Sequence, residues 1–239
     1  MVVMGDLQPA GPVESLESIA AVIDRMNAEG GDLVLLLGDY VSTRRLSTGF
    51  IDPHDTAPIL GRLEAPLGVY AVLGNHDWWW DGPAMRRLLT DQGITVLEDA
   101  AVRIDAGAQA LWVAGLSDPV TQVPDLGATL AQAATEAPLL LLTHTPDVLP
   151  DVPTDVGLTL AGHTHGGQVN LPFFGRLIVP SRFGDRFAYG PIEEAGRRLY
   201  VTSGIGTAII PVRFLVPPEI AAITLTPAPA LGNGQDGEN

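Results

Sequence analysis

Five short apolar runs, each ending beside a potential metal ligand, constrain this chain more than any other feature of its sequence. Each run is followed by a glycine or threonine and then by one polar residue, in the order Asp6, Asp39, Asn75, His144 and His163. Short apolar runs bounded by turn residues are typical of buried strands. Because ligands gather at the carboxyl ends of such strands, the five side chains are expected along one rim. Carboxylate, amide and imidazole groups together suit a divalent ion of intermediate hardness, such as Mn, Fe, Zn or Co.

The rest of the sequence alternates between strand and helix patterns. Helices are predicted at residues 16–26, 56–63, 86–92 and 126–136. Further strands are predicted at residues 94–97, 101–104, 110–116, 199–202 and 220–225. Alternating strands and helices indicate parallel pairing and the later hairpins indicate antiparallel pairing, so we expect an α/β sandwich of two mixed β-sheets. It should form a single domain over residues 1–225, followed by a Pro- and Gly-rich disordered tail over 226–239.

Charge and composition exclude several classes of function. With 28 acidic against 13 basic residues the net charge is −15, which argues against binding to duplex nucleic acid. Every basic residue is an arginine, so Schiff-base chemistry and a phosphate-loop lysine are excluded. The lack of cysteine excludes thiol catalysis, disulfides and Cys-ligated zinc. The longest apolar runs, at residues 33–37 and 138–142, are far shorter than the roughly 20 residues of a membrane-spanning helix.

Three motifs resemble those of the calcineurin-like metallophosphoesterase superfamily. They are Gly38-Asp39, Gly74-Asn75-His76-Asp77 and Gly162-His163-Thr164-His165, in this order and after these strands. The resemblance covers nearly the whole chain and implies a four-layer αββα sandwich with helices outside both sheets. The continuation Gly166-Gly167-Gln168 and Leu171-Pro172, with the later Val201-Thr202-Ser203-Gly204-Ile205-Gly206, is similar to a bacterial branch that contains membrane-associated phosphodiesterases and lipid-precursor pyrophosphatases.

The resemblance implies a centre of two divalent ions, with Mn first and Fe, Zn, Co or Mg as alternatives. Asp39 would bridge the ions; one site would add Asp6 and His165, and the other Asn75, His144 and His163. Gln8 stands where the Asp-x-His motif of the family carries a metal-binding histidine. Whether Gln8 is itself a ligand or only hydrogen-bonds to one stays open. An amide is a poorer donor than imidazole to zinc or iron, so the first site is expected to be weaker, shifted toward Mn or Mg, or partly empty.

The implied reaction is phosphoester hydrolysis by in-line attack of a hydroxide that bridges the two ions. His76 would assist the leaving group and Asp77 would orient His76. The branch points to phosphodiesters or pyrophosphates rather than monoesters, carried by a phosphorylated small molecule or a lipid-like substrate. The alternative is a catalytically weakened binding scaffold, for which Gln8 is the supporting feature and against which His76 argues.

Several other residues are candidates for the substrate pocket. Three consecutive tryptophans at 78–80 cannot all face one core, so Trp78 or Trp79 is expected at the pocket mouth. Arg44 would clamp a second phosphate or carboxylate, with a solvated loop as the alternative. The chain begins directly in a strand, which leaves open an upstream segment that attaches it to a membrane, and a location either in the bacterial cytoplasm or at the periphery of the cell membrane. The oligomeric state is not indicated.

Overall fold

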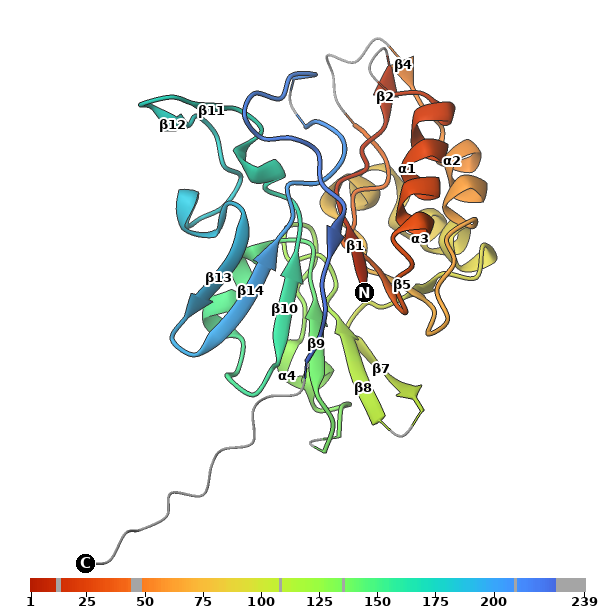
Figure 1. The fold of residues 1–239 in the computed structure, drawn as a ribbon, viewed down its shortest axis with the longest axis vertical. Coiled ribbons are helices and arrows are strands. Elements are labelled where there is room, and N and C mark those ends of the chain that lie inside the picture. Colours follow the sequence, from red (N-terminus) through yellow and green to blue (C-terminus); the bar gives the residue numbers. More distant parts are fainter. Residues whose placement is uncertain (12–13, 44–48, 108, 135, 209, 227–239) are drawn as a thin grey trace, which may run out of the picture.

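The architecture is taken from a computed structural model of the chain, shown in Figure 1. The structure describes residues 1–11, 14–43, 49–107, 109–134, 136–208 and 210–226. Arg44 and residues 227–239 of the predicted tail lie outside these ranges. Within them, no helix is both long and apolar enough to cross a membrane.

Two mixed sheets form the centre of the molecule. The first has the order β15-β1-β3-β5-β6, in which all strands but β15 are parallel. Its strands are β15 (Ala221–Ala222), β1 (Val2–Met4), β3 (Val34–Leu36), β5 (Val69–Ala71) and β6 (Thr95–Val96). The second has the order β13-β14-β10-β9-β8-β7, with antiparallel strands at both edges. Its strands are β13 (Gly190–Glu194), β14 (Arg197–Val201), β10 (Leu158–Ala161), β9 (Leu139–Leu142), β8 (Gln109–Gly115) and β7 (Ala100–Ala106).

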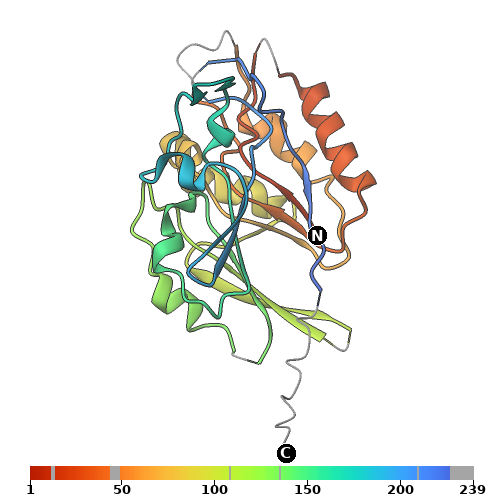
Figure 2. The ribbon, with the colours of Figure 1, turned by 60° about the vertical axis from the view of Figure 1, so that its left-hand side comes forward.

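Helices cover the outer face of each sheet, as Figures 1 and 2 show from two directions. The first sheet carries α1 (Leu16–Ala28), α2 (Pro53–Leu60) and α3 (Asn75–Asp91). The second carries α4 (Leu126–Leu130) and the 3-10 turns η1 (Pro146–Asp151) and η3 (Gly184–Phe187). The remaining elements are the pair β2 (Ala10–Gly11) with β4 (Gly49–Phe50), the hairpin β11 (Asn170–Leu171) with β12 (Gly175–Arg176), and the turn η2 (His165–Gly167).

Alternation of side chains along the strands builds the layers. In β1, Val2 and Met4 pack against the helices, whereas Val3 faces the second sheet. In β9, Leu140 and Leu142 fill the space between the sheets, whereas Leu141 packs on the α4 side. Successive residues of a strand point to opposite faces, so wholly apolar strands serve two cores at once. The expected four-layer αββα sandwich is therefore confirmed.

Two helix predictions need correction. The helix predicted at residues 126–136 ends at Leu130, and beyond it the Gln132 side-chain amide bonds to the backbone of Asp99 and Ala101 at the start of β7. The helix predicted to begin at residue 86 begins at Asn75, with one non-helical residue at Asp81. The second difference matters for the site, since it places residues 75–77 in the first turn of a helix rather than in an open loop.

Candidate metal centre

The candidate ligands lie at the carboxyl ends of parallel strands from both sheets. Asp6 follows β1, Asp39 follows β3, and Asn75 opens α3 just after β5. His144 and His163 follow β9 and β10 of the second sheet. Contacts across the sandwich then bring the two sets of loops together at one edge.

Asp39, His144 and His163 form the middle of this cluster. Each offers one ligand atom, and these atoms all lie within 4.8 Å of one another. Nε2 of His144 lies 3.3 Å from Oδ2 of Asp39, 3.1 Å from Oδ1 of Asn75 and 3.1 Å from Nδ1 of His163. One carboxylate oxygen, one amide oxygen and two imidazole nitrogens therefore converge from both sheets.

The backbone beneath His144 orients its ring. Nδ1 of His144 donates to the carbonyl oxygen of Leu37 at 2.7 Å, which leaves Nε2 facing Asp39 and Asn75. Gly38 makes this approach possible: its φ is +91°, and a Cβ there would lie 2.6 Å from the backbone nitrogen of Gly74 and 2.9 Å from Nδ1 of His144. Any larger residue at position 38 would push the ring or the loop away.

Asp6, Gln8 and His165 surround Asp39 on the side of the first strand. Both oxygens of Asp6 lie 3.0 Å from the backbone N–H of His163, and its Oδ1 lies 3.6 Å from Nε2 of His165. The amide nitrogen of Gln8 donates to Oδ2 of Asp39 at 2.6 Å. Among the described residues, Oε1 of Gln8 and Nε2 of His165 are buried atoms with no hydrogen-bond partner.

Strained backbone is concentrated at these same residues. Five of the seven candidate ligands adopt a positive φ although none is a glycine; they are Asp6, Gln8, Asp39, His163 and His165. For such residues the left-handed region is sparsely populated, and it persists where the surroundings impose it. The loops thus hold their polar side chains toward one another at a conformational cost.

Burial and the mutual charges shift the pKa values within the cluster. Burial lowers the pKa of His144, but the Asp39 carboxylate outweighs it and raises that pKa to about 10. Burial raises the pKa of Asp39, but the positive charge of His144 outweighs it and holds that pKa below its ordinary value. Without a cation, these two groups are therefore a buried ion pair, with a proton on Nε2 of His144.

His163 and His165 stay neutral near pH 7. Burial and the neighbouring His144 charge lower the pKa of His163 to about 4. Burial and the Arg213 guanidinium lower the pKa of His165 to about 3. Neutral imidazole is the form that binds metals, so both rings are ready ligands. The Asp6 carboxyl, by contrast, is not fully ionised near pH 7. Burial raises its pKa to about 7 despite the opposing charge of His144.

These residues fit a divalent cation. A cation would neutralise the buried carboxylates and replace the proton on His144. It would also give partners to the orphaned atoms of Gln8 and His165. The donors are a mixture of oxygen and nitrogen, which is the combination expected for Mn, Fe, Co or Zn.

His76 lies beside the cluster, and Thr43 orients it. The backbone N–H of Thr43 donates to Nδ1 of His76 at 3.2 Å, and the Thr43 hydroxyl lies 2.7 Å from the same nitrogen. Because Nδ1 accepts a hydrogen bond, the proton of the neutral ring is on Nε2. The backbone N–H of His76 donates to Oδ1 of Asp39 at 2.8 Å, which ties the ring to the candidate ligands.

Asp77 occupies a different position from the one expected. Its carboxylate accepts hydrogen bonds, each 2.8 Å long, from the backbone N–H groups of Asp39, Tyr40 and Gly74. It therefore clamps the loop after β3 onto the first turn of α3. The role of orienting His76, predicted for Asp77, falls to Thr43 in this geometry.

The three consecutive tryptophans do not all face one core, as their spacing predicts. The Trp79 side chain is exposed, and its ring centroid lies 4.9 Å from that of His76, at the mouth of the site. The expectation for Trp78 needs correction, because this half-buried ring packs on the core beneath α3 and against Gly82. Trp80 also packs on that core.

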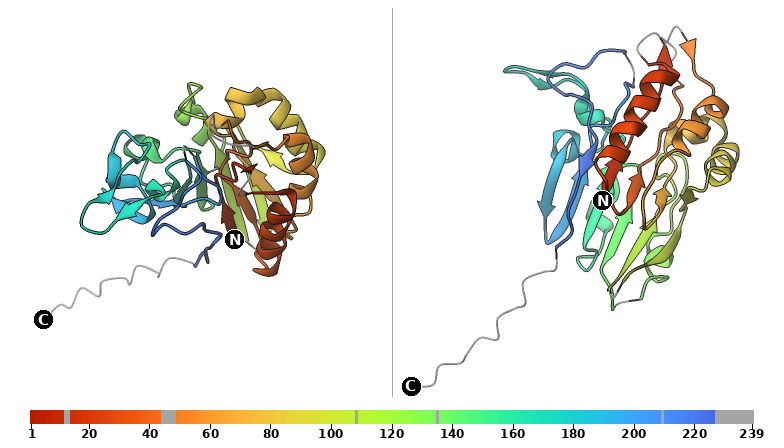
Figure 3. Two further views of the ribbon diagram at one scale, coloured as in Figure 1. Left: turned by 90° about the horizontal axis from the view of Figure 1, so that it is seen from above. Right: turned by 45° about the vertical axis from the view of Figure 1, so that its right-hand side comes forward.

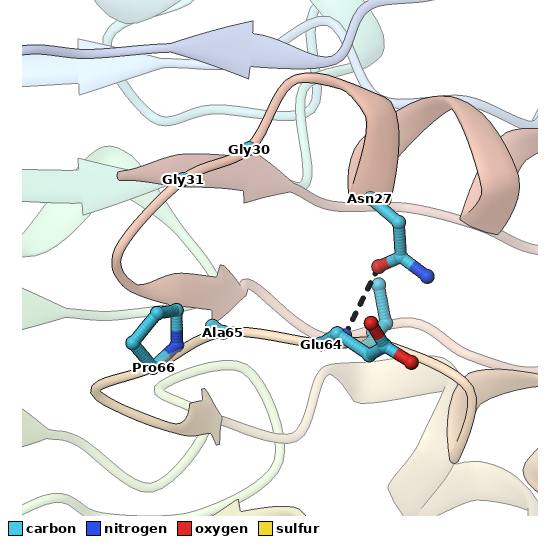
Figure 4. Close-up of a pocket in the computed structure, with 7 residues that line it drawn as sticks. Asn27, Gly30, Gly31, Glu64, Ala65 and Pro66 are labelled. Carbon is cyan, nitrogen blue, oxygen red and sulfur yellow. Dashed lines mark hydrogen bonds between the residues drawn. The ribbon is translucent and has the colours of Figure 1, made fainter.

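A cavity of about 320 Å³ opens directly beside His163. Its wall combines apolar side chains with one ion pair between Asp147 and Arg182, whose Nε and Oδ2 atoms are 3.4 Å apart. The residues that line it are Pro119, Val120, Thr145, Asp147, Val148, His163 and Arg182. A larger cavity of about 610 Å³ lies before β3 and β5, at their amino ends and thus away from the ligands (Figure 4).

Sequence reasoning missed four residues around the site. Thr43, Arg182 and Arg213 lie on loops without a motif; Arg213 donates to the backbone oxygens of Ser203 and Gly204 and approaches Nδ1 of His165 at 3.5 Å. Asp118 could have been found, because it follows the predicted strand at 110–116 as the candidate ligands follow theirs. It is buried, and its charge helps to raise the pKa of His144.

Known proteins resemble this chain in sequence and in fold. The sequence pattern of the calcineurin-like phosphoesterase family matches residues 1–167. The uncharacterized metallophosphoesterase YkuE of Bacillus subtilis is 33% identical over 88% of this chain and 73% of its own length. An uncharacterized metallophosphoesterase of Aquifex aeolicus is 31% identical over 90% of this chain and 80% of its own.

Among solved structures, the NAD nucleotidase of Haemophilus influenzae shares the fold with a TM-score of 0.52 at 16% identity. The similarity covers 84% of this chain and 49% of that one, so this chain spans about half the length of the nucleotidase. Together with the cluster of Asp39, His144 and His163, these similarities show that the chain belongs to the calcineurin-like family of metal-dependent phosphoesterases.

Proposed function

We propose that the chain hydrolyses phosphodiesters or pyrophosphates with two divalent ions, Mn²⁺ first among them. The observation that carries this proposal is the convergence of Asp39, Asn75, His144 and His163, with His76 tied to Asp39 through its backbone. Asp39, Asn75, His144 and His163 would hold one ion, and Asp6, Asp39 and His165 the other. When bound, the ions would activate water and stabilise the charge on phosphoryl oxygens.

The residues around the ions would supply the remaining chemistry. His76 presents its Nε2–H while Thr43 engages Nδ1, and this N–H would donate a hydrogen bond to the charge that develops on the leaving oxygen. The N-terminus of α3, with its partial positive charge, lies at the same place, which favours an anionic substrate. Trp79, exposed beside His76, offers a flat surface on which a base, sugar or acyl group can pack.

The cavity beside His163 supports a phosphorus with two substituents rather than one. Its volume of about 320 Å³ admits a medium-sized group next to the candidate ligands. Arg182 at its wall is a guanidinium whose side chain is 73% exposed, suited to a second phosphate. A phosphorylated small molecule or a lipid-like pyrophosphate would fill both the ligand cluster and this cavity.

The test is turnover of bis-p-nitrophenyl phosphate against mono-p-nitrophenyl phosphate by metal-stripped protein supplied with Mn²⁺, Mg²⁺, Zn²⁺ or Co²⁺. We expect hydrolysis of the diester to exceed that of the monoester, with Mn²⁺ the most effective ion. Faster hydrolysis of the monoester would overturn the bond preference and leave the metal centre standing.

A binding scaffold is the second candidate, and one contact favours it. The Gln8 amide nitrogen donates to Oδ2 of Asp39 and so uses a lone pair that a bridging carboxylate would give to an ion. A rotation of this amide would present Oε1 instead, which is the orientation that a metal requires. Absence of turnover with all four ions, despite metal binding, would support the scaffold.

A further inference from the structure

Large apolar side chains are exposed at one end of the molecule. Of the fifteen exposed large hydrophobic residues in the described part of the chain, eight lie in the hairpin β11–β12 with its flank and in the segment 210–215. Phe173 and Phe174, at the turn of the hairpin, are 105% and 82% exposed. We name this surface the apolar tip; it comprises Phe173, Phe174, Leu177, Ile178, Ile210, Val212, Phe214 and Leu215.

Hydrogen bonds join the two segments into one surface. The backbone N–H of Asn170 donates to the oxygen of Phe214 at 2.9 Å, and the N–H of Phe214 donates to the oxygen of Gln168 at 3.0 Å. The Gln168 amide also donates to the backbone oxygens of Ile210 and Val212. In Figure 3 the hairpin and the blue segment accordingly project at the same end of the molecule.

The apolar tip is attached directly to the metal centre. Gln168, which holds the segment 210–215, follows His165 by three residues. Arg213, in the middle of that segment, reaches back to Nδ1 of His165. A surface that receives the apolar tip would therefore lie on the same side of the molecule as the site.

The two segments that form the apolar tip carry a charge opposite to that of the whole chain. Residues 164–184 and 202–218 contain no Asp or Glu, although the chain has 28 acidic residues and a net charge of −15. The same stretches carry Arg182, whose side chain is 73% exposed, the half-buried Arg176, and Arg213, whose guanidinium turns inward to the backbone oxygens of Ser203 and Gly204. An anionic surface would repel most of this molecule and attract this end.

We propose that the apolar tip docks on an anionic lipid bilayer. Exposed phenylalanines on a projecting hairpin without acidic residues would insert their rings at the level of the headgroups, and the exposed Arg182 would meet lipid phosphates. Docking would set the metal centre at the membrane surface, within reach of phosphoesters carried by lipids. This inference concerns binding and stands independently of the bond that the site cleaves.

The test is cosedimentation with vesicles of phosphatidylcholine alone or mixed equally with phosphatidylglycerol. The wild-type chain should bind the anionic vesicles, more weakly at high salt and more weakly to the neutral ones. The double variant Phe173→Ser/Phe174→Ser should lower the partition coefficient by roughly tenfold or more, because two exposed rings no longer insert. Val123→Ser, at a side chain 95% exposed outside the apolar tip, is the matched control and should bind like wild type.

Other results would overturn the proposal. One is that the wild type binds neither kind of vesicle, and another is that the double variant binds as well as the wild type. A third is that the wild type self-associates and the double variant does not, which would make the surface an interface between copies. Turnover of a soluble diester is measured in parallel and should be unchanged in the double variant. Lack of turnover in every variant would count against the proposed reaction without bearing on the vesicle result.

Discussion

The two halves of the cluster differ in whether their buried polar atoms have hydrogen-bond partners. We call Asn75, His144 and His163 the first half, and Gln8 and His165 the second half. In the first half, the oxygen of Asn75 and a nitrogen of His163 each lie 3.1 Å from Nε2 of His144. In the second half, Oε1 of Gln8 and Nε2 of His165 are buried without a hydrogen-bond partner among the described residues.

Charge adds to this difference. The second half faces the Arg213 guanidinium, which lowers the pKa of His165 and would repel an ion beside it. The first half has the Asp39 carboxylate at its centre, and Arg182, which lines the cavity beside His163, is paired with Asp147. We therefore expect two metal sites that share Asp39 and differ in affinity, so that substitutions in the two halves should have different effects.

Asp39→Asn should have the largest effect, because the shared carboxylate serves both halves. We expect loss of both ions and a fall in turnover of roughly 1000-fold or more, measured by metal content per chain and by diester hydrolysis. Asp6→Asn is the matched variant and should lose the second ion while retaining the first. Equal metal loss in the two variants would remove the distinction between the halves.

His76→Ala should separate chemistry from metal binding. Its ring would stabilise the leaving group through a hydrogen bond but is not among the proposed ligands, so turnover should fall by about 100-fold or more with metal content unchanged. Thr43→Val should give a smaller loss, of several-fold, together with a shifted pH profile, because Nδ1 loses its hydroxyl partner. A His76→Ala protein that no longer retains metal would place this residue among the ligands.

Metal affinity should rise with pH. The metal-free cluster holds a proton on His144, whose pKa is raised to about 10, and another on Asp6 below its raised pKa of about 7. Because an incoming ion must displace these protons, affinity should increase by about tenfold per pH unit for each proton released, up to those pKa values. Calorimetry in buffers of different ionisation enthalpy measures the release. A dissociation constant that is independent of pH between neutral and mildly alkaline conditions would contradict the protonated state of His144.

Gln8→His should have the smallest effect and act on the second half alone. Replacing the amide by imidazole supplies the better donor, so affinity for the second ion should rise by roughly tenfold while the first ion is unaffected. Titration of stripped protein with Mn²⁺ or Zn²⁺ resolves the two steps. A change confined to the first step would show that position 8 acts through Asp39 rather than on its own half.

Much of the fold followed from the sequence because its strands are local and strongly patterned. Apolar runs such as 33–37 and 139–142 are buried on both faces, and the polar residues at their carboxyl ends meet at the expected rim. The first turn of α3 was not predicted, because Gly74-Asn75 is typical of a turn and only the hydrogen bond from the Gly74 N–H to Asp77 establishes a helix cap.

The parts that escaped prediction depend on contacts between distant residues. Arg213 reaches His165 across 48 positions, and Thr43 reaches His76 across 33, with no spacing rule to connect either pair. The apolar tip was also missed: the sequence around Phe173 and Phe174 favours hairpin packing over a place in the pocket wall, and only the structure shows both side chains exposed.

The most direct measurement is anomalous scattering from crystals of metal-stripped protein grown with one equivalent of Mn²⁺. Unequal sites predict a single peak bounded by Asp39, Asn75, His144 and His163. A first peak enclosed by Asp6, Gln8 and His165, or no peak near Asp39, would contradict the account.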